Sequence, residues 1–172
     1  MAEPPRPALY ALLDMARAPH LYAPVTELER QGAALCLFEG TIAEPVRRAA
    51  PFIVDIARAS DLMGRWAAEG AGQSWGVLME VKLPLVAARR HVRRFLQVRL
   101  PDGAGPVMMR LWDPRVLGPV LAQADAAHGA KLLPAGIAFL VERDAASVMR
   151  YEAADGAVTA RVTGWPVQAW AA

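Results

Sequence analysis

The chain has 172 residues, of which 55% are hydrophobic, so it is long enough for one domain with a packed core and is not an intrinsically disordered protein. Its 19 Lys and Arg residues against 17 Asp and Glu residues leave a net charge of +2. That charge is too small for a general nucleic-acid coat protein, and no uncharged stretch approaches the ~20 apolar residues of a membrane-spanning helix.

The first half of the chain alternates short apolar runs with helical patterns. Four apolar runs are short enough for buried strands, and the third of them contains the β-branched residues Ile53, Val54 and Ile56. The four runs are residues 9–13, 34–38, 51–56 and 75–81. Helices are predicted over residues 25–31, where Gly32 tolerates the left-handed conformation that ends a helix, and over residues 60–68, after the N-cap types Ser60 and Asp61.

The second half begins with the longest helical pattern, residues 83–96, which carries apolar residues on one face and arginines on the other. A hairpin follows, with strands at residues 97–100 and 107–112. Asp113 and Pro114 then suit the N-cap and first position of a helix, with a restart or kink expected at Pro119. Three more strands are predicted at residues 137–142, 148–152 and 158–162.

These elements predict an α/β fold, in which a mixed sheet carries flanking helices and ends in an antiparallel, strand-rich C-terminal tail. The alternating strands and helices of residues 1–122 are expected to form the main lobe. Residues 123–172 are expected to be a short, strand-rich extension of the same domain.

Charge is unevenly distributed along the chain. Residues 1–81 hold 7 Arg and 10 acidic residues, residues 82–115 hold 8 basic and 2 acidic residues, and residues 116–172 hold 4 basic and 5 acidic residues. Five cations of the middle segment lie on or just after the polar face of the predicted helix: Arg89, Arg90, Arg93, Arg94 and Arg99. Besides a solvated helix face, two functions fit them. We favour an acidic protein partner over nucleic acid, because no aromatic residues interleave with the arginines.

A second motif, Gly72-Gln-Ser74-Trp-Gly76, matches the G-x-S-x-G pattern of the nucleophile elbow in α/β-hydrolases. Asp113 or Asp125 and then His128 follow in the chain order of that triad, so a serine hydrolase is an alternative function. The predicted context is reversed, however, because a helix precedes the motif and a strand follows it. The other interpretation is a helix-to-strand turn in which the glycines relieve crowding.

No other pattern indicates enzyme chemistry. The single cysteine, Cys36, suits a reducing cytoplasm and lies in an apolar run, so we expect a buried structural thiol. His20, His91 and His128 have no Cys, His or acidic residue at metal-ligand spacing, and the chain has no phosphate-binding glycine loop. We therefore expect no catalytic residue, no metal and no cofactor. The N-terminus has no apolar segment of the kind found in secretory signals.

Six motifs occur in an order that resembles the type VI secretion effector-chaperone family, the Tap/Tec-type adaptor domain. The resemblance spans about residues 9–121. The motifs are Tyr10-Ala-Leu-Leu-Asp14, Cys36-Leu-Phe-Glu-Gly40, Ala50-Pro-Phe-Ile-Val54, Gly72-Gln-Ser-Trp-Gly76, Arg90-His-Val-Arg-Arg-Phe-Leu-Gln-Val-Arg99 with Pro101-Asp-Gly103, and Met109-Arg-Leu-Trp-Asp-Pro-Arg-Val-Leu117.

The resemblance implies a cytoplasmic, non-enzymatic bacterial adaptor that holds a toxic effector and helps load it onto a VgrG or PAAR spike protein. It implies no nucleic-acid partner. Family members usually carry a larger helical C-terminal lobe, and because the predicted end of this chain is strand-rich, we expect that lobe to be truncated or replaced here. The matching motif positions are expected to be mainly architectural, with a buried Arg–carboxylate network linking strand ends. They are Asp14, Glu39, Trp75, Arg110, Asp113 and Arg115.

Overall fold

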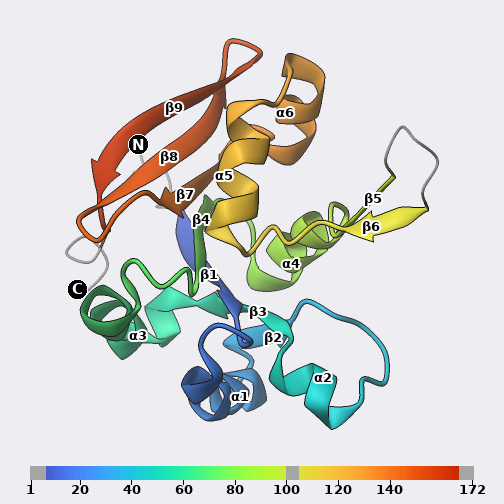
Figure 1. Ribbon diagram of the computed structural model, residues 1–172, viewed down its shortest axis with the longest axis vertical. Helices are drawn as coiled ribbons and strands as arrows, with labels where there is room; N and C mark the ends of the chain where they lie inside the picture. The colour runs from blue at the N-terminus through green and yellow to red at the C-terminus, as the bar shows by residue number, and fades with distance from the viewer. Residues whose placement is uncertain (1–6, 100–104, 167–172) are drawn as a thin grey trace, which may run out of the picture.

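A computed structural model describes residues 7–99 and 105–166, which form a seven-stranded sheet flanked by helices (Figure 1). The strand order is β2-β3-β1-β4-β7-β8-β9. The strands are β1 (Ala8–Asp14), β2 (Ala34–Cys36), β3 (Pro51–Asp55), β4 (Gly76–Val81), β7 (Ile137–Glu142), β8 (Ser147–Ala154) and β9 (Ala157–Gly164). A separate two-stranded ribbon pairs β5 (Gln97–Arg99) with β6 (Pro106–Met108) and projects to one side of the molecule.

The predicted α/β class is confirmed, with flanking helices and antiparallel strands at the C-terminal end. Within the sheet every pairing is antiparallel, so the mixture of strand directions that we expected does not occur. The reason lies in β1. Both β3 and β4 pair with it in antiparallel fashion, so the helical connection between them joins two parallel strands that β1 separates. The segment from β3 to β4 has the strand–helix–strand order of a βαβ unit, but the antiparallel strand β1 lies between its two strands. This arrangement is a split βαβ unit.

The helices form a layer on each face of the sheet. They are α1 (Tyr22–Arg30), α2 (Glu44–Arg48), α3 (Ser60–Arg65), α4 (Leu85–Arg93), α5 (Pro114–Ala122) and α6 (Ala126–Leu132). Single turns precede α1 at Pro19–Leu21 and α3 at Ile56–Arg58, and a π-helical turn, Trp66–Gly70, extends α3. No helix in the described ranges has both the length and the apolar character that a membrane crossing requires.

Alternation along the strands divides the core between the two faces. Leu13 of β1 packs with Val25 of α1 and Trp66 on one face. Its neighbour Leu12 packs on the other face with Val92 of α4 and Leu117 of α5. The same division continues into β7–β9, because β7 pairs directly with β4. The sheet therefore runs without interruption past residue 122.

The predicted element map needs correction in several places. The second strand of the ribbon, predicted to run to residue 112, ends at Met108. The helix α5 continues through Pro119 without a restart, since Pro119 lies on its exposed side and costs one helical hydrogen bond while the apolar face stays in place. The short helices α2 and α6 were not predicted. No residue of α2 is buried, so it shows no apolar periodicity, and α6 begins with an N-cap at Asp125 whose side chain accepts from the His128 N–H.

The two C-terminal strands are longer than predicted, and their turn explains why. Asp155 and Gly156 both have positive φ, 52° and 79°, which is the combination of a type I′ hairpin turn. That turn matches the twist of the flanking strands, so β8 and β9 pair from Ala154 and Ala157 to their far ends.

Candidate functional site

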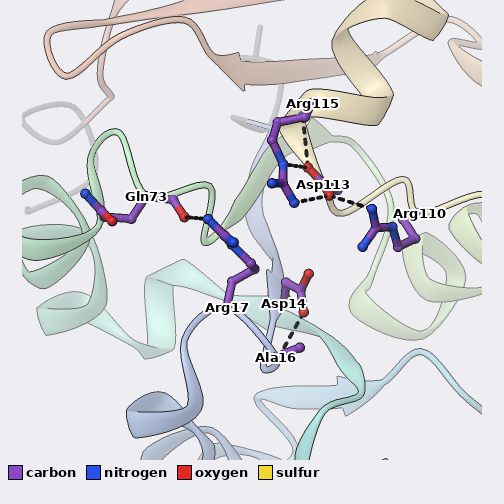
Figure 2. Close-up of polar contacts among 7 residues, drawn as sticks. All are labelled: Asp14, Ala16, Arg17, Gln73, Arg110, Asp113 and Arg115. Carbon is purple, nitrogen blue, oxygen red and sulfur yellow. Dashed lines mark hydrogen bonds and ion pairs between the residues drawn. The ribbon is translucent and has the colours of Figure 1, made fainter.

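Asp113 is the centre of the first polar cluster (Figure 2). Its side chain is 1% exposed and caps α5 by accepting a hydrogen bond from the backbone N–H of Arg115, at 3.0 Å. The Arg115 side chain donates to both carboxylate oxygens, Nε at 2.9 Å and Nη2 at 2.8 Å, and Arg110 Nη2 lies 3.3 Å from Oδ2. This bidentate geometry gives strong, charge-assisted hydrogen bonds.

The charges of this cluster shift the pKa values of Asp113 and Arg115. Burial by itself raises the pKa of the Asp113 carboxyl, but hydrogen bonds and positive charge from Arg115, with Arg110, hold that pKa below its ordinary value. The Asp113 carboxylate in turn raises the pKa of Arg115, and the negative charge of Asp14 adds to the effect. Asp113 is therefore ionised at neutral pH although it is buried.

Asp14 lies at the end of β1 and faces the same region (Figure 2). It is 4% exposed and accepts a hydrogen bond from the Ala16 N–H at 2.9 Å. Nearby, Arg17 donates to the Gln73 carbonyl at 3.1 Å, which links the loop after β1 to the turn before β4. The Arg–carboxylate contacts are therefore local to the start of α5, and among the described residues no arginine forms an ion pair with Asp14 at the end of β1. Neither Arg17 nor Gln73 could be predicted from the sequence, because their contact joins distant segments and has no characteristic spacing.

Glu39 is the centre of the second cluster, on the other side of the sheet from α1. It forms ion pairs with Arg89, at 3.4 Å, and with Arg93, both from α4. Arg89 also donates to two backbone carbonyls, from Nε to Cys36 at 2.6 Å and from Nη2 to Phe38 at 3.1 Å. Two of the predicted partner-binding arginines are therefore engaged within the protein, and Arg89 ties α4 to the end of β2.

The remaining arginines of the predicted basic face are exposed. Arg90 and Arg94 lie one helical turn apart, Arg99 lies on β5, and no carboxylate among residues 7–99 and 105–166 comes within ion-pair distance of Arg90 or Arg94. Beside them a groove of about 630 Å3 runs between the β2 end and the ribbon. Apolar side chains, including Phe38, Leu96 and Met108, line it together with Arg93 and Arg94.

These two kinds of arginine predict different stability effects. We expect Arg89→Leu to lower the free energy of unfolding by about 1–2 kcal/mol, because it removes charge-assisted bonds to two carbonyls of a partly buried segment. The matched variant Arg90→Leu should stay within about 0.5 kcal/mol of the parent. Urea unfolding of both variants measures this difference, and equal losses would contradict the structural role of Arg89.

The G-x-S-x-G motif forms the turn that leads from the π-helical turn into β4. Ser74 has a positive φ of 57°, and the buried Trp75 contacts His20 edge-to-face at 4.8 Å between ring centroids. The strand follows the serine instead of preceding it, so this is the reverse of a nucleophile elbow. The hydrogen-bonded pair Asp125–His128 lies at α6, well away from this turn (Figure 1).

Other candidate nucleophiles and ligands have structural surroundings. Cys36 is buried, and that burial raises the pKa of its thiol. His91 Nε2 lies 2.9 Å from the Leu132 carbonyl, which joins α4 to α6. Across the described residues, no three His, Cys, Asp or Glu side chains are grouped as metal ligands would be. Glu142, at the end of β7, was not predicted as a site residue: burial raises the pKa of its carboxyl, and hydrogen bonds from the amides of Gly72 and Ser74 partly oppose that rise.

Comparison with known proteins assigns the chain to a family. No curated protein and no solved structure matches the chain. A family model described as "Domain of unknown function (DUF4123)" matches residues 9–131, from the start of β1 into α6. The match includes both arginine clusters and the groove beside α4. Since it covers well over half of the chain, the protein belongs to the DUF4123 family.

Proposed function

We propose that this protein is a non-enzymatic bacterial adaptor, which binds a type VI secretion effector in the cytoplasm and helps load it onto a VgrG or PAAR spike protein. The observation that supports this function most directly is the exposed arginine pair on α4 beside a partly apolar groove. Membership of the DUF4123 family and the order of the six motifs agree with it. The spike and the effector are the partners we propose.

Arg90 and Arg94 have the properties of a protein-binding surface. They are four residues apart on one helix, so their positive fields add, and Glu39 is occupied by Arg89 and Arg93. Arg93 is itself three-quarters buried and held by its ion pair with Glu39, so less side-chain entropy is lost when a partner binds beside it. Arginine is also enriched among the residues that dominate binding energy at protein interfaces.

The groove supplies the apolar part of such an interface. Phe38, Leu96 and Met108 line it, and Met108 is 53% exposed. A methionine side chain adapts its shape to different apolar partners. A partly apolar groove next to Arg90 and Arg94 suits a partner segment that carries both apolar and acidic side chains. We therefore place the effector contact on α4 and this groove.

Charge reversal tests the placement. The double variant Arg90→Glu, Arg94→Glu should bind the effector encoded next to this gene at least tenfold more weakly, a loss of about 1.4 kcal/mol, because attraction becomes repulsion. Binding is measured by calorimetry with purified proteins. Lys131→Glu, Arg143→Glu is the control, since it changes the net charge equally at exposed positions outside α4 and the groove. Equal affinity of the two double variants would move the contact away from α4.

Co-expression tests the function itself. Products of the neighbouring genes should co-purify with this protein, and the effector should be less stable in cells that lack it. The failure of every neighbouring effector, VgrG and PAAR product to bind would contradict the adaptor function. Binding of nucleic acid by α4, lost steeply as salt rises, would favour the nucleic-acid alternative instead.

A further inference from the structure

The two edges of the sheet differ in how their backbone groups are satisfied. At the β2 edge, side chains cover the outward-facing groups. The Cys36 N–H donates to Glu29 Oε1 at 3.4 Å, and Arg89 donates to the carbonyls of Cys36 and Phe38. With only the three residues Ala34–Cys36, this edge is also too short to accept another strand.

The β9 edge has no such protection in the described part of the chain. The register of the β8–β9 hairpin starts at Ala154 and Ala157 around a two-residue turn. Residues 157, 159, 161 and 163 therefore form the hydrogen-bonded pairs with β8, and the N–H and C=O groups of the even-numbered residues point outward. No hydrogen bond from any described residue reaches the outward groups of Val158, Ala160 or Val162.

The side chains of β9 do not discourage a further strand either. The strand is eight residues long and has no Pro, Lys or acidic residue, which are the usual guards of an edge. Its one charge, Arg161, lies on the other face with its Nε 3.5 Å from Glu152 Oε1. On the face of the α4–α6 layer, Val162 is 50% exposed although its neighbour Val158 packs on the core.

We propose that β9 pairs with β9 of a second copy of this chain, so that two sheets join edge to edge across a two-fold axis at Ala160. Antiparallel pairing about Ala160 sets Val158 opposite the partner's Val162 and Val162 opposite the partner's Val158. These two pairs and the central pair of Ala160 with the partner's Ala160 are all of the hydrogen-bonded type. Each pair therefore exchanges two backbone hydrogen bonds.

The sequence of β9 is complementary to itself in this register. Valine meets valine on one face, which covers the exposed part of Val162. On the other face Arg161 meets the hydroxyl of Thr159, and the two Arg161 side chains are offset diagonally, each beside its own Glu152. At the axis, the small side chain of Ala160 lets the two strands approach each other, and alanine does not favour a turn as glycine would. A second copy of the chain therefore supplies a suitable neighbour for each of these side chains. The proposal does not depend on the adaptor function.

The mass of the purified chain in solution tests the proposal. Light scattering after size exclusion should give twice the monomer mass for the parent protein at micromolar concentrations. Ala160→Lys should give a monomer with unchanged circular dichroism, because two ammonium groups would face each other at the axis and Ala160 makes no bond to β8. The control, Ala23→Lys on the exposed surface of α1, should remain a dimer.

Cross-linking tests the register. Ala160→Cys should form a covalent dimer under mild oxidation, because directly paired residues have Cα atoms about 5.5 Å apart, within disulfide reach. The parent chain, whose Cys36 is buried, should not form one. A monomeric parent, a dimeric Ala160→Lys variant or a dimeric Ala160→Cys variant that fails to cross-link would each overturn the proposal. So would a parent whose β9 amides become protected from exchange only when an effector is added.

Discussion

Replacing Gly76 with alanine is expected to lower the free energy of unfolding by about 3 kcal/mol or more, among the largest effects of any single methyl group in this chain. A Cβ at this position would lie 2.0 Å from the carbonyl oxygen of Leu12 and 2.9 Å from its carbonyl carbon. Both atoms belong to the backbone of β1, the strand between β3 and β4. Relief of the clash therefore needs the two central strands to separate, which breaks their hydrogen bonds.

The other glycine of the same motif provides the control. Gly72 has a φ of +81°, and no atom lies within 4 Å of a Cβ built there. Gly72→Ala should cost only the strain of a left-handed residue, about 1–2 kcal/mol. Urea unfolding of the two variants compares them directly. If Gly72→Ala were the more damaging change, the motif would owe its glycines to backbone conformation and not to the close approach of β1 and β4.

The second large effect is expected for Asp113→Ala, at about 3 kcal/mol. The change removes the N-cap of α5, which alone contributes about 1 kcal/mol, and the charge-assisted bonds from Arg115 to both carboxylate oxygens. Asp113→Asn keeps an oxygen for the cap and loses the charge, so it should lie between alanine and the parent. Thermal unfolding of the three proteins at neutral pH measures the order.

The same variant predicts a pH dependence with a definite sign. Because the pKa of Asp113 in the folded protein is lowered, the folded state holds this proton less tightly than the unfolded state does. The carboxylate therefore stabilises the fold above the unfolded pKa of about 4, and this stabilisation is lost as the pH falls through the lowered folded value. Asp113→Asn should lose less stability than the parent between neutral pH and that range. A parallel pH profile for the two proteins would contradict the assignment.

Local signals in the sequence predicted most elements of this fold. Asp113 and Pro114 identify the start of α5, and apolar runs locate β1, β3, β4 and β7 within one or two residues. These features depend on neighbouring residues only. The direction of the strands does not, because it depends on β1 entering between β3 and β4, and no local pattern encodes which strand lies between two others.

The candidate sites likewise combine features that depend on neighbouring residues with features that depend on distant ones. The basic face of α4 was predicted from its sequence, but the sequence could not separate Arg89 and Arg93 from Arg90 and Arg94. That separation comes from Glu39, which is 50 residues away from Arg89 along the chain. Likewise, Arg17 and Gln73 meet only because β1 and β4 are paired. Contacts between distant segments therefore define which arginines remain available to a partner.

The position of β1 also determines when the sheet can assemble during synthesis. Among the seven strands of this sheet, β1 is synthesised first, yet its partners come much later: Tyr10 pairs with Asp55 on one side and with Met79 on the other. Until Val81 has emerged, the apolar faces of β1 have no complete sheet to join, and such long-range pairing folds slowly. The hairpin of β8 and β9 needs only a two-residue turn. We expect the nascent chain to depend on protection from aggregation up to residue 81 and to complete the C-terminal half of its sheet quickly.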